Sequence, residues 1–599
     1  MDPSIEIKST EDRMNLIREC IDCKDPVGVK KLILEDKFDD ESAHWELLSL
    51  LGPCVSQENL ELCPGFVDVS HRCMNYVIKI GKAKELLLAL LEQAEELGDS
   101  VRFATFLQLI QNTILKITSG RVGCLEIALE TLANCIRNLE LPEDMYHEHE
   151  ERRAQDLDPV VAKINVDVKE YLDFFKPFVE EVRLDVESEV KNCAKQREIL
   201  VKYLLKVIDH PLAYLDLTAR EENGLVIKAN SRLHMETVTG YLMKLTPNIS
   251  ALIDSSNEET NRLMRKRKHT EMDSELLADI PPVLSLCCLS YFMHVEQFEQ
   301  TSLSCLVTKK GIFESNMKFI QILMLRQENE IRRKGVALFM TLVKELPPGI
   351  VFEYEDLDRP EYFGIIGAIF DIMIHSPDRE LRQCCVKVFP SFIQYFCYEA
   401  RYQISVKLFG TLTHAGAYGF CVNLFKNQME EILSNPEMCS EDAEFFIGLN
   451  LKRIFLLICN LPEGPATDLV ENSDRIIAVL NLMRYLILRD PPKKNLTGFW
   501  NFIKELETDF LKPLQVGIDM SKGHYALEVE GIEKGNDSKA TNEEEVEMSV
   551  SVAGFKMPKM ARGQKIAVMR QALNTLDLIN SLVVRVNELL EQQVKEISS

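Results

Sequence analysis

Apolar residues recur along most of this chain at the three-to-four-residue spacing of an α-helix, and the alternation typical of strands is scarce. The residue pairs that favour β-hairpin turns, Asn-Gly and Asp-Gly, are scarce as well. The clearest amphipathic stretches predict helices near 84–97, 103–118, 124–139 and 196–208. The pattern therefore predicts an all-α protein.

Two segments match each other at a fixed offset of fifty residues. One begins ILMLRQENEIRRKGVALF and the other IMIHSPDRELRQCCVKVF, and the matched positions are Ile322/Ile372, Glu330/Glu380, Arg332/Arg382, Val336/Val386 and Phe339/Phe389. Each segment ends one helix, turns through polar residues and starts the next helix with an acid in its first turn. Such a period indicates stacked helix pairs, so we predict an elongated HEAT-like helical repeat array (α-solenoid). The arginines are expected to bridge to a neighbouring repeat.

Composition divides the chain into four expected parts. Residues 1–275 form an N-terminal helical region that ends in a polar loop, and residues 276–530 form the HEAT-like repeat region. Residues 531–560 begin with a stretch nearly free of apolar side chains, which predicts an acidic disordered linker. Residues 561–599 form a helix that caps the array, because its apolar stripe is too hydrophobic to stay exposed: Ile566, Met569, Leu573, Leu576, Ile579, Val583, Val586 and Leu590.

The stretch 461–525 predicts two helices joined by a polar connection. Asn472 or Ser473 suits the N-cap of the first helix, whose apolar residues fall on one face. Asp490-Pro491-Pro492 ends this helix, because proline lacks an amide hydrogen and restricts the residue before it. The second helix is predicted to run roughly from 498 to 511, stopping before Pro513.

This stretch also carries a family resemblance. The matching segments are Leu461-Pro462-Glu463-Gly464, Thr467-Asp468-Leu469, 472–476, Leu480-Asn481-Leu482, Arg484-Tyr485-Leu486, 510–514, Met520-Ser521-Lys522 and His524-Tyr525, with further echoes at 84–92, 176–182 and 576–589. On these residues the chain resembles the glomulin family, which inhibits cullin-RING ubiquitin ligases. The likeness is dense over about the last quarter of the chain, thin along most of the rest, and slight in 1–80 and 536–548.

The resemblance implies a HEAT-like repeat protein whose C-terminal repeats grip the RING subunit of SCF-type cullin-RING ligases, with the cullin contacted indirectly. It implies that the surface recruiting the ubiquitin-conjugating enzyme is covered. The family is also linked to immunophilin binding, which no residue here locates. The candidate interface residues are polar side chains within the matching segments: Asp474, Arg475, Arg484, Lys512, Lys522, His524, Tyr525 and Arg585. For each of them an intramolecular cap or an inter-repeat ion pair is the alternative role. A generic helical-repeat adaptor or scaffold, for transport or assembly, is the alternative function, because an array alone fits both.

Charge and cysteine content narrow the class of partner. With 69 Lys/Arg against 94 Asp/Glu, the formal net charge of −25 argues against nucleic-acid binding, and the acidic N-terminal third would be repelled by anionic membranes. Seventeen cysteines form no dense framework, and the charged N-terminus is not typical of a secretory signal. We therefore expect reduced thiols and a cytoplasmic protein, or one that is also nuclear. The uncharged run 280–295 is too short to span a bilayer and predicts a buried helix.

Short motifs that suggest chemistry have simpler interpretations. Arg265-Lys266-Arg267-Lys268 lies among acids and lacks aromatic neighbours, which favours a solvated loop. Cys20 and Cys23 form a lone CxxC, whereas zinc would need a second pair. His147 and His149 are too closely spaced to share a helical face. Adjacent cysteines at 287–288 and 384–385 lie in apolar stretches and are expected to be core thiols. No phosphate-binding glycine loop or nucleophile elbow is found, so the sequence predicts no metal, no cofactor and no enzyme.

Overall fold

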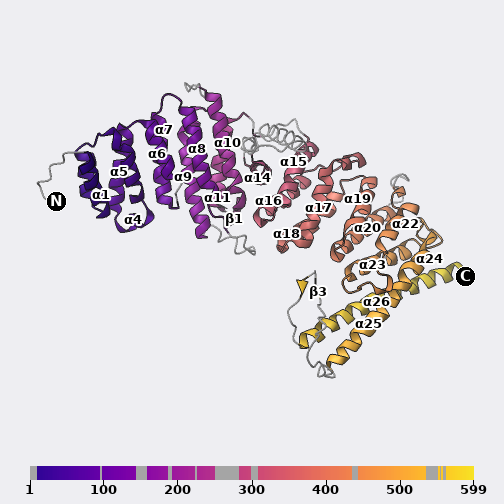
Figure 1. Cartoon of the computed structure of the whole chain (residues 1–599). Helices are drawn as coiled ribbons and strands as arrows, with labels where there is room; N and C mark the ends of the chain where they lie inside the picture. Colours follow the sequence, from indigo (N-terminus) through magenta and orange to yellow (C-terminus); the bar gives the residue numbers. More distant parts are fainter. Residues whose placement is uncertain are drawn as a thin grey trace, which may run out of the picture. The chain divides into compact units, whose positions relative to one another are not determined.

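The computed structural model describes residues 10–94, 98–142, 158–185, 192–222, 225–247, 249, 282–298, 308–434, 443–533, 551–552, 555–556 and 562–598. Within these ranges nearly every element is a helix (Figure 1). The chain forms two compact units, residues 1–347 and 348–599. The all-α, helical-repeat fold predicted from the sequence is confirmed.

The first unit contains α-helices of 5 to 23 residues and one short hairpin. Its elements are α1 (Thr10–Asp22), α2 (Pro26–Lys30), α3 (His44–Leu51), α4 (Gln57–Leu62), α5 (Pro64–Ile80), α6 (Ala83–Ala94), α7 (Ser100–Lys116), α8 (Arg121–Arg137), α9 (Pro159–Glu181), α10 (Cys193–Asp209), β1 (Ala219–Glu222), β2 (Leu225–Lys228), α11 (Asn230–Leu245), α14 (Val283–His294), α15 (Lys309–Met324) and α16 (Asn329–Lys344). The strands β1 and β2 pair antiparallel, with Ala219 opposite Lys228.

Helices of the first unit pack on their second neighbour as well as on their first. Helix α6 contacts both α7 and α8, α7 contacts α9, and α8 contacts α10. This two-layer pattern is that of a solenoid, in which successive helix pairs stack and share one core. The run 280–295 contributes α14, whose residues from Ser285 to Met293 are all buried, as its lack of charge predicted.

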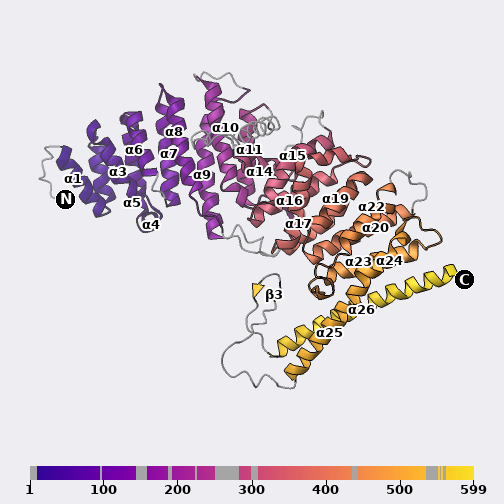
Figure 2. The same ribbon diagram turned by 45° about the vertical axis from the view of Figure 1, so that its right-hand side comes forward.

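The second unit holds the stretch that resembles glomulins. Its elements are α17 (Pro360–His375), α18 (Arg379–Ile393), α19 (Tyr398–Thr411), α20 (Ala415–Ser434), α22 (Gly448–Ile458), η8 (Gly464–Ala466), α23 (Ser473–Arg489), η9 (Phe499–Asn501), α24 (Ile503–Leu506), η10 (Glu507–Leu511), α25 (Lys512–Glu533), β3 (Ser551–Val552), β4 (Phe555–Lys556) and α26 (Arg562–Ser598). Helix α23 lies between α20 and α26, and α25 packs along α26 (Figure 1, Figure 2).

The two matched segments occupy the same place in two helix pairs. Each covers the end of one helix, the turn and the start of the next: α15 into α16, and α17 into α18. Glu330 and Glu380 both lie in the first turn of the second helix, as predicted. The prediction for the arginines was a bridge to a neighbouring repeat, and the hydrogen bonds described for them lie within a helix pair. Arg332 donates to the carbonyl of Arg326 and Arg382 to that of Ser376, in both cases six residues earlier. These bonds close the turn within a helix pair, because an arginine in the first turn reaches the free carbonyls that end the preceding helix.

The boundary between the units differs from the one expected at residue 275. Helices α10 and α14 flank that position in the sequence and pack against each other, so both lie in the first unit, and the division falls after residue 347. Of the expected linker 531–560, α25 reaches Glu533 and β3 pairs with β4; the rest, like 255–274, lies outside the described residues. Among the helices described, none combines the length and apolarity needed to cross a bilayer.

Candidate functional site

The loop before α23 is built by its own polar side chains. Gly464 adopts a φ of +55°, which favours glycine, and starts the short turn η8. The hydroxyl of Thr467 accepts a hydrogen bond from the Glu463 amide at 3.1 Å. The Asp468 carboxylate accepts from the amides of Val470 and Glu471 at 2.9 and 3.0 Å. Most of the polar residues that carry the family resemblance in this loop therefore fix its backbone.

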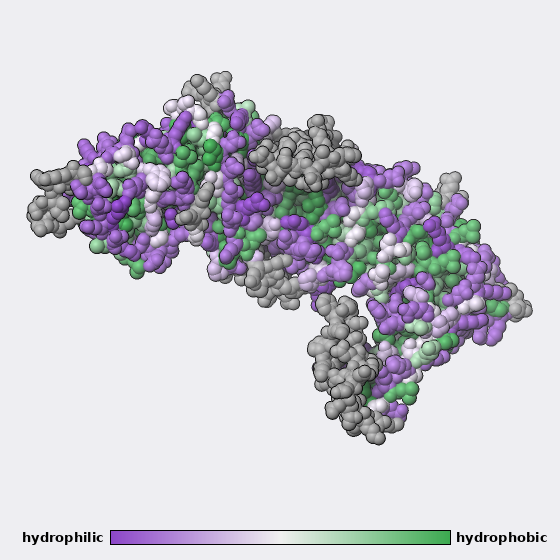
Figure 3. Space-filling model, viewed as in Figure 1, coloured by the Kyte–Doolittle hydropathy of each residue, from purple (hydrophilic) through white to green (hydrophobic). Residues whose placement is uncertain are grey.

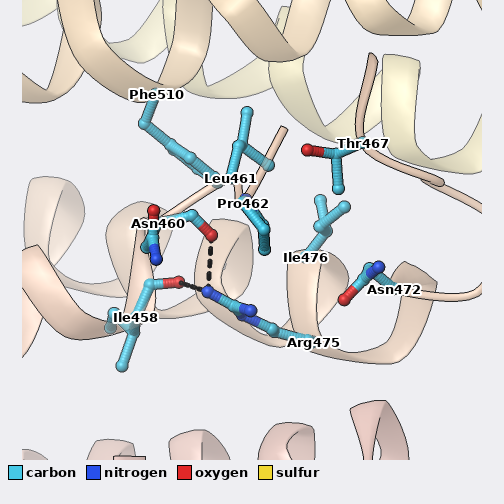
Figure 4. A pocket seen from close by; sticks show the side chains of 9 residues that line it. All are labelled: Ile458, Asn460, Leu461, Pro462, Thr467, Asn472, Arg475, Ile476 and Phe510. Atoms are coloured by element: carbon cyan, nitrogen blue, oxygen red, sulfur yellow. Dashed lines mark hydrogen bonds between the residues drawn. The ribbon is translucent and has the colours of Figure 1, made fainter. Parts of the chain in front are cut away.

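Arg475 joins the start of α23 to the end of α22. Its guanidinium donates to the carbonyls of Asn460 at 2.5 Å and Ile458 at 3.4 Å, as Figure 4 shows. The same group lies 4.5 Å from the centre of the Tyr418 ring on α20. Burial, the larger effect, raises the pKa of Tyr418 to about 12, although the charge of Arg475 lowers it. Arg475 therefore has a structural role within the unit, which was the alternative considered for it.

Helix α25 approaches this loop closely at a glycine. A Cβ placed on Gly517 would lie 2.8 Å from the carbonyl oxygen of Pro465 and 3.4 Å from a methyl carbon of Leu469. No larger side chain fits without a shift of the loop backbone. This contact positions the outer face of α25 relative to α23.

Pro513 lies inside the helical stretch, contrary to the prediction that the helix stops before it. Residues Glu507–Leu511 form a π-helical turn, and the amide of Lys512 bonds to the carbonyl of Glu507, five residues earlier. In an α-helix the proline ring would clash with the carbonyl of the preceding turn and leave that carbonyl without an amide donor. A π turn is wider than an α turn, so it leaves room for the ring. The chain thus continues into α25 as far as Glu533.

The corner after α23 is organised by a buried carboxylate. Asp490 accepts hydrogen bonds from the amides of Leu496 and Thr497, both at 2.8 Å, and from the Thr497 hydroxyl at 2.6 Å. Its carbonyl accepts from the indole nitrogen of Trp500 at 2.6 Å. Asp490 and Thr497 are fully buried. The Asp-Pro-Pro sequence therefore ends the helix, as predicted, and also holds the following loop.

Replacing Asp490 with asparagine is expected to lower the free energy of unfolding by about 1–3 kcal/mol. The NH₂ group of asparagine would lie against N–H and O–H groups that donate to the carboxylate, so one of these buried donors would lose its acceptor. The chain has two tryptophans, Trp45 in the first unit and Trp500 in the second. Urea unfolding followed by Trp500 fluorescence in a Trp45→Phe background reports this unit. Asp509→Asn, at an exposed position, is the control and should leave the transition unchanged. Equal transitions for both variants would contradict the role assigned to Asp490.

The eight candidate interface residues lie on three helices, α23, α25 and α26. Lys522 pairs with Asp577 on α26 at 2.6 Å, and Arg585 pairs with Glu588 on its own helix at 3.0 Å. His524 lies 3.5 Å from Glu528, and Asp474 is exposed in the first turn of α23. Of these contacts, only the pair between Lys522 and Asp577 joins two helices, which is the alternative considered for that residue. The role of these residues in binding stays a prediction.

Tyr525 is half-buried on α25. Burial raises the pKa of its hydroxyl, and the nearby carboxylates of Asp468 and Glu528 raise it further. The ring therefore stays neutral at physiological pH and lies near the loop before α23. Arg484 on α23 and Lys512 at the start of α25 are exposed, and no hydrogen bond or ion pair with another described residue is found for either. Of the eight, these two and Asp474 are the exposed side chains for which no such contact with a described residue is found.

The structure shows where the cysteine pairs lie that the sequence singled out as candidate reactive sites. Cys287, Cys288 and Cys385 are buried, as expected of core thiols, and Cys384 is half-buried. Burial raises the pKa of Cys288 to about 11 and that of Cys385 to about 12. The segments 147–150 and 265–268 lie outside the described residues. No group of three metal-binding side chains was found in the part of the chain that the structure describes.

Comparison with known proteins identifies the family. A family model described as "Uncharacterised protein family, YAP/Alf4/glomulin" matches residues 42–569. The chain belongs to this family. It is 29% identical to glomulin of Mus musculus over 566 residues, which cover 93% of this chain and 89% of the relative. It is 28% identical to glomulin of Homo sapiens over 558 residues, 92% and 88% of the two chains.

One solved structure aligns along nearly the whole chain but adds no argument. It is a circular tandem repeat protein with novel repeat topology and enhanced subunit contact surfaces, aligned over 98% of this chain and 95% of its own. Sequence identity is 12% and the TM-score is 0.16. The fold assignment therefore rests on the helices and their packing.

Proposed function

We propose that this protein is a non-catalytic regulator that binds the RING subunit of cullin-RING ubiquitin ligases and masks the surface for the ubiquitin-conjugating enzyme. The observation that carries the proposal is the similarity to two glomulins over more than nine-tenths of the chain. The cullin is contacted only indirectly. Immunophilin binding stays an expectation from the resemblance, with no residue assigned to it. The same proposal places the protein in the cytoplasm, and also in the nucleus where such ligases act.

The face around α23 and α25 is the part of the chain we assign to the RING subunit. It contains the segments with the densest resemblance, and its backbone is fixed by Asp468, Arg475 and Gly517. Arg484 and Lys512 are exposed cations on these two helices. Because the loop is held by internal hydrogen bonds, little conformational entropy is lost when a partner binds.

Reversing both charges in the variant Arg484→Glu/Lys512→Glu is expected to weaken binding of the RING subunit by about tenfold or more, since rim charges steer encounter and repel when reversed. The measurement is the dissociation constant for the purified RING subunit, by calorimetry or surface plasmon resonance. Lys79→Glu, an exposed lysine on α5 of the first unit, is the matched control.

The alternative is a generic helical-repeat adaptor with another partner. A full-length chain that fails to retain the RING subunit in a pull-down would favour that alternative. If the RING subunit binds and the double charge reversal has no effect, the function stands and the interface assignment is wrong.

A further inference from the structure

A second exposed surface of the unit formed by residues 348–599 is distinct from the proposed RING face. The amide of Gly448 donates to the carbonyl of Thr497 at 2.8 Å, joining the start of α22 to the loop after α23. Leu449 and Leu496 flank this bond, and their exposed fractions are 85% and 64%. Two exposed leucines that are distant in sequence thus each lie one residue from the same backbone hydrogen bond.

The backbone beneath these leucines is fixed. The buried Asp490 carboxylate holds the amides of Leu496 and Thr497. A Cβ on Gly498 would lie 3.3 Å from the Cα of Gly448, and both glycines have positive φ, +72° and +58°. Exposed apolar side chains on a rigid backbone are typical of binding surfaces, because the fold already restricts the backbone and binding then loses less conformational entropy.

The apolar surface continues along α22. Leu449, Arg453 and Leu456 follow the i, i+4, i+7 spacing of one helical face, and Leu456 is 58% exposed. Figure 3 shows hydrophobic residues gathered over α22. We call Leu449, Leu456, Leu496, Lys493 and Lys494 the α22 surface.

The loop that carries Leu496 has a charge opposite to that of the whole chain. Residues 489–497 contain three Lys/Arg and one acid, a formal charge of +2, within a protein of net charge −25. The single acid is the buried, hydrogen-bonded Asp490. Arg489, Lys493 and Lys494 are exposed, and their side chains make no ion pair with another described residue. The loop therefore presents cations beside the two leucines.

We propose that the α22 surface binds an acidic, leucine-containing segment of a partner protein. Aliphatic side chains of that segment cover Leu449, Leu456 and Leu496, while its carboxylates lie against Lys493 and Lys494. The aliphatic character of the surface disfavours single-stranded nucleic acid, which binds by stacking its bases on aromatic rings. The strongly acidic remainder of the chain disfavours an anionic membrane. This binding goes beyond the proposed inhibition of ubiquitin transfer, and it involves neither Arg484 nor Lys512.

The test uses the full-length chain and three fluorescent peptides: repeats of Glu-Glu-Leu, of Lys-Lys-Leu and of Glu-Glu-Ser. Fluorescence anisotropy should show binding of the Glu-Glu-Leu peptide alone, weakening as salt is raised because the contacts are charged and exposed. The variant Lys493→Glu/Lys494→Glu is expected to weaken this binding about tenfold, and Leu449→Ser by a similar factor. Lys79→Glu should bind like the unaltered chain. Unaltered retention of the RING subunit by these variants would separate this proposal from the proposed function.

Several results would overturn the proposal. Equal binding of the Lys-Lys-Leu peptide would remove the charge argument, and equal binding of the Glu-Glu-Ser peptide would remove the apolar one. Co-sedimentation with phosphatidylserine vesicles that is lost in the double lysine variant would assign the surface to a membrane. Thermal unfolding of each variant at the same temperature as the unaltered chain shows that a loss of binding is local, since every substituted side chain is exposed.

Discussion

Under the proposed function, excess ubiquitin-conjugating enzyme is expected to restore the activity of a cullin-RING ligase to which this protein has been added. A RING domain is small, and a stable protein interface occupies about 800 Å² on each partner. A helical array that covers this area therefore overlaps the site of the conjugating enzyme. The two proteins compete by mass action, so conjugating enzyme at about 100 times its dissociation constant should raise the half-inhibitory concentration by about 100-fold.

The measurement is ubiquitin-chain formation across a titration of conjugating enzyme, at several fixed concentrations of the inhibitor. The same titration without inhibitor corrects for saturation of the ligase. Inhibition that stays constant at saturating enzyme, with both proteins bound to one RING subunit in a pull-down, would mean a remote conformational effect. Inhibitor present well below the ligase concentration should have little effect, because masking is stoichiometric.

A carboxylate introduced into the buried face of α26 is expected to unfold the C-terminal unit. Ile579 is fully buried where α26 packs on α23 and α25, whereas its neighbour Leu578 is 50% exposed. Ile579→Asp places an unpaired charge in an apolar core, which should lower the free energy of unfolding by about 4 kcal/mol or more. Leu578→Asp is the matched control and should change it by less than about 0.5 kcal/mol.

Urea unfolding with Trp500 fluorescence, again in the Trp45→Phe background, measures this difference. Binding of the RING subunit should fall with the folded fraction of the unit in Ile579→Asp and stay unchanged in Leu578→Asp. Similar unfolding midpoints for the two variants would show that α26 is not needed for the stability of α23 and α25. Binding retained by a chain whose C-terminal unit is unfolded would place the interface elsewhere.

Sequence periodicity alone was sufficient to predict the helices and many of the faces that they bury. The predicted stripe of the last helix matches its core contacts: Leu576, Ile579, Val583, Val586 and Leu590 are buried, and the remaining three are half-buried. The fifty-residue offset likewise located two equivalent turns, since a helix start needs an acid and a turn needs polar residues wherever it occurs. These are local requirements, and local sequence expresses them.

Tertiary structure decided what individual polar residues do. Arg475, predicted as a possible contact, is satisfied by carbonyls that only the folded loop brings to it, and Pro513 is tolerated because a π turn precedes it. Lys493 and Lys494 were not among the predicted interface residues, although adjacent lysines after Pro-Pro and two residues before Leu496 were a visible signal. Leu449 and Leu496 became neighbours only through the hydrogen bond between Gly448 and Thr497. Helical spacing fixes which residues share a face, whereas contacts between distant segments depend on how loops close, and no local pattern records that.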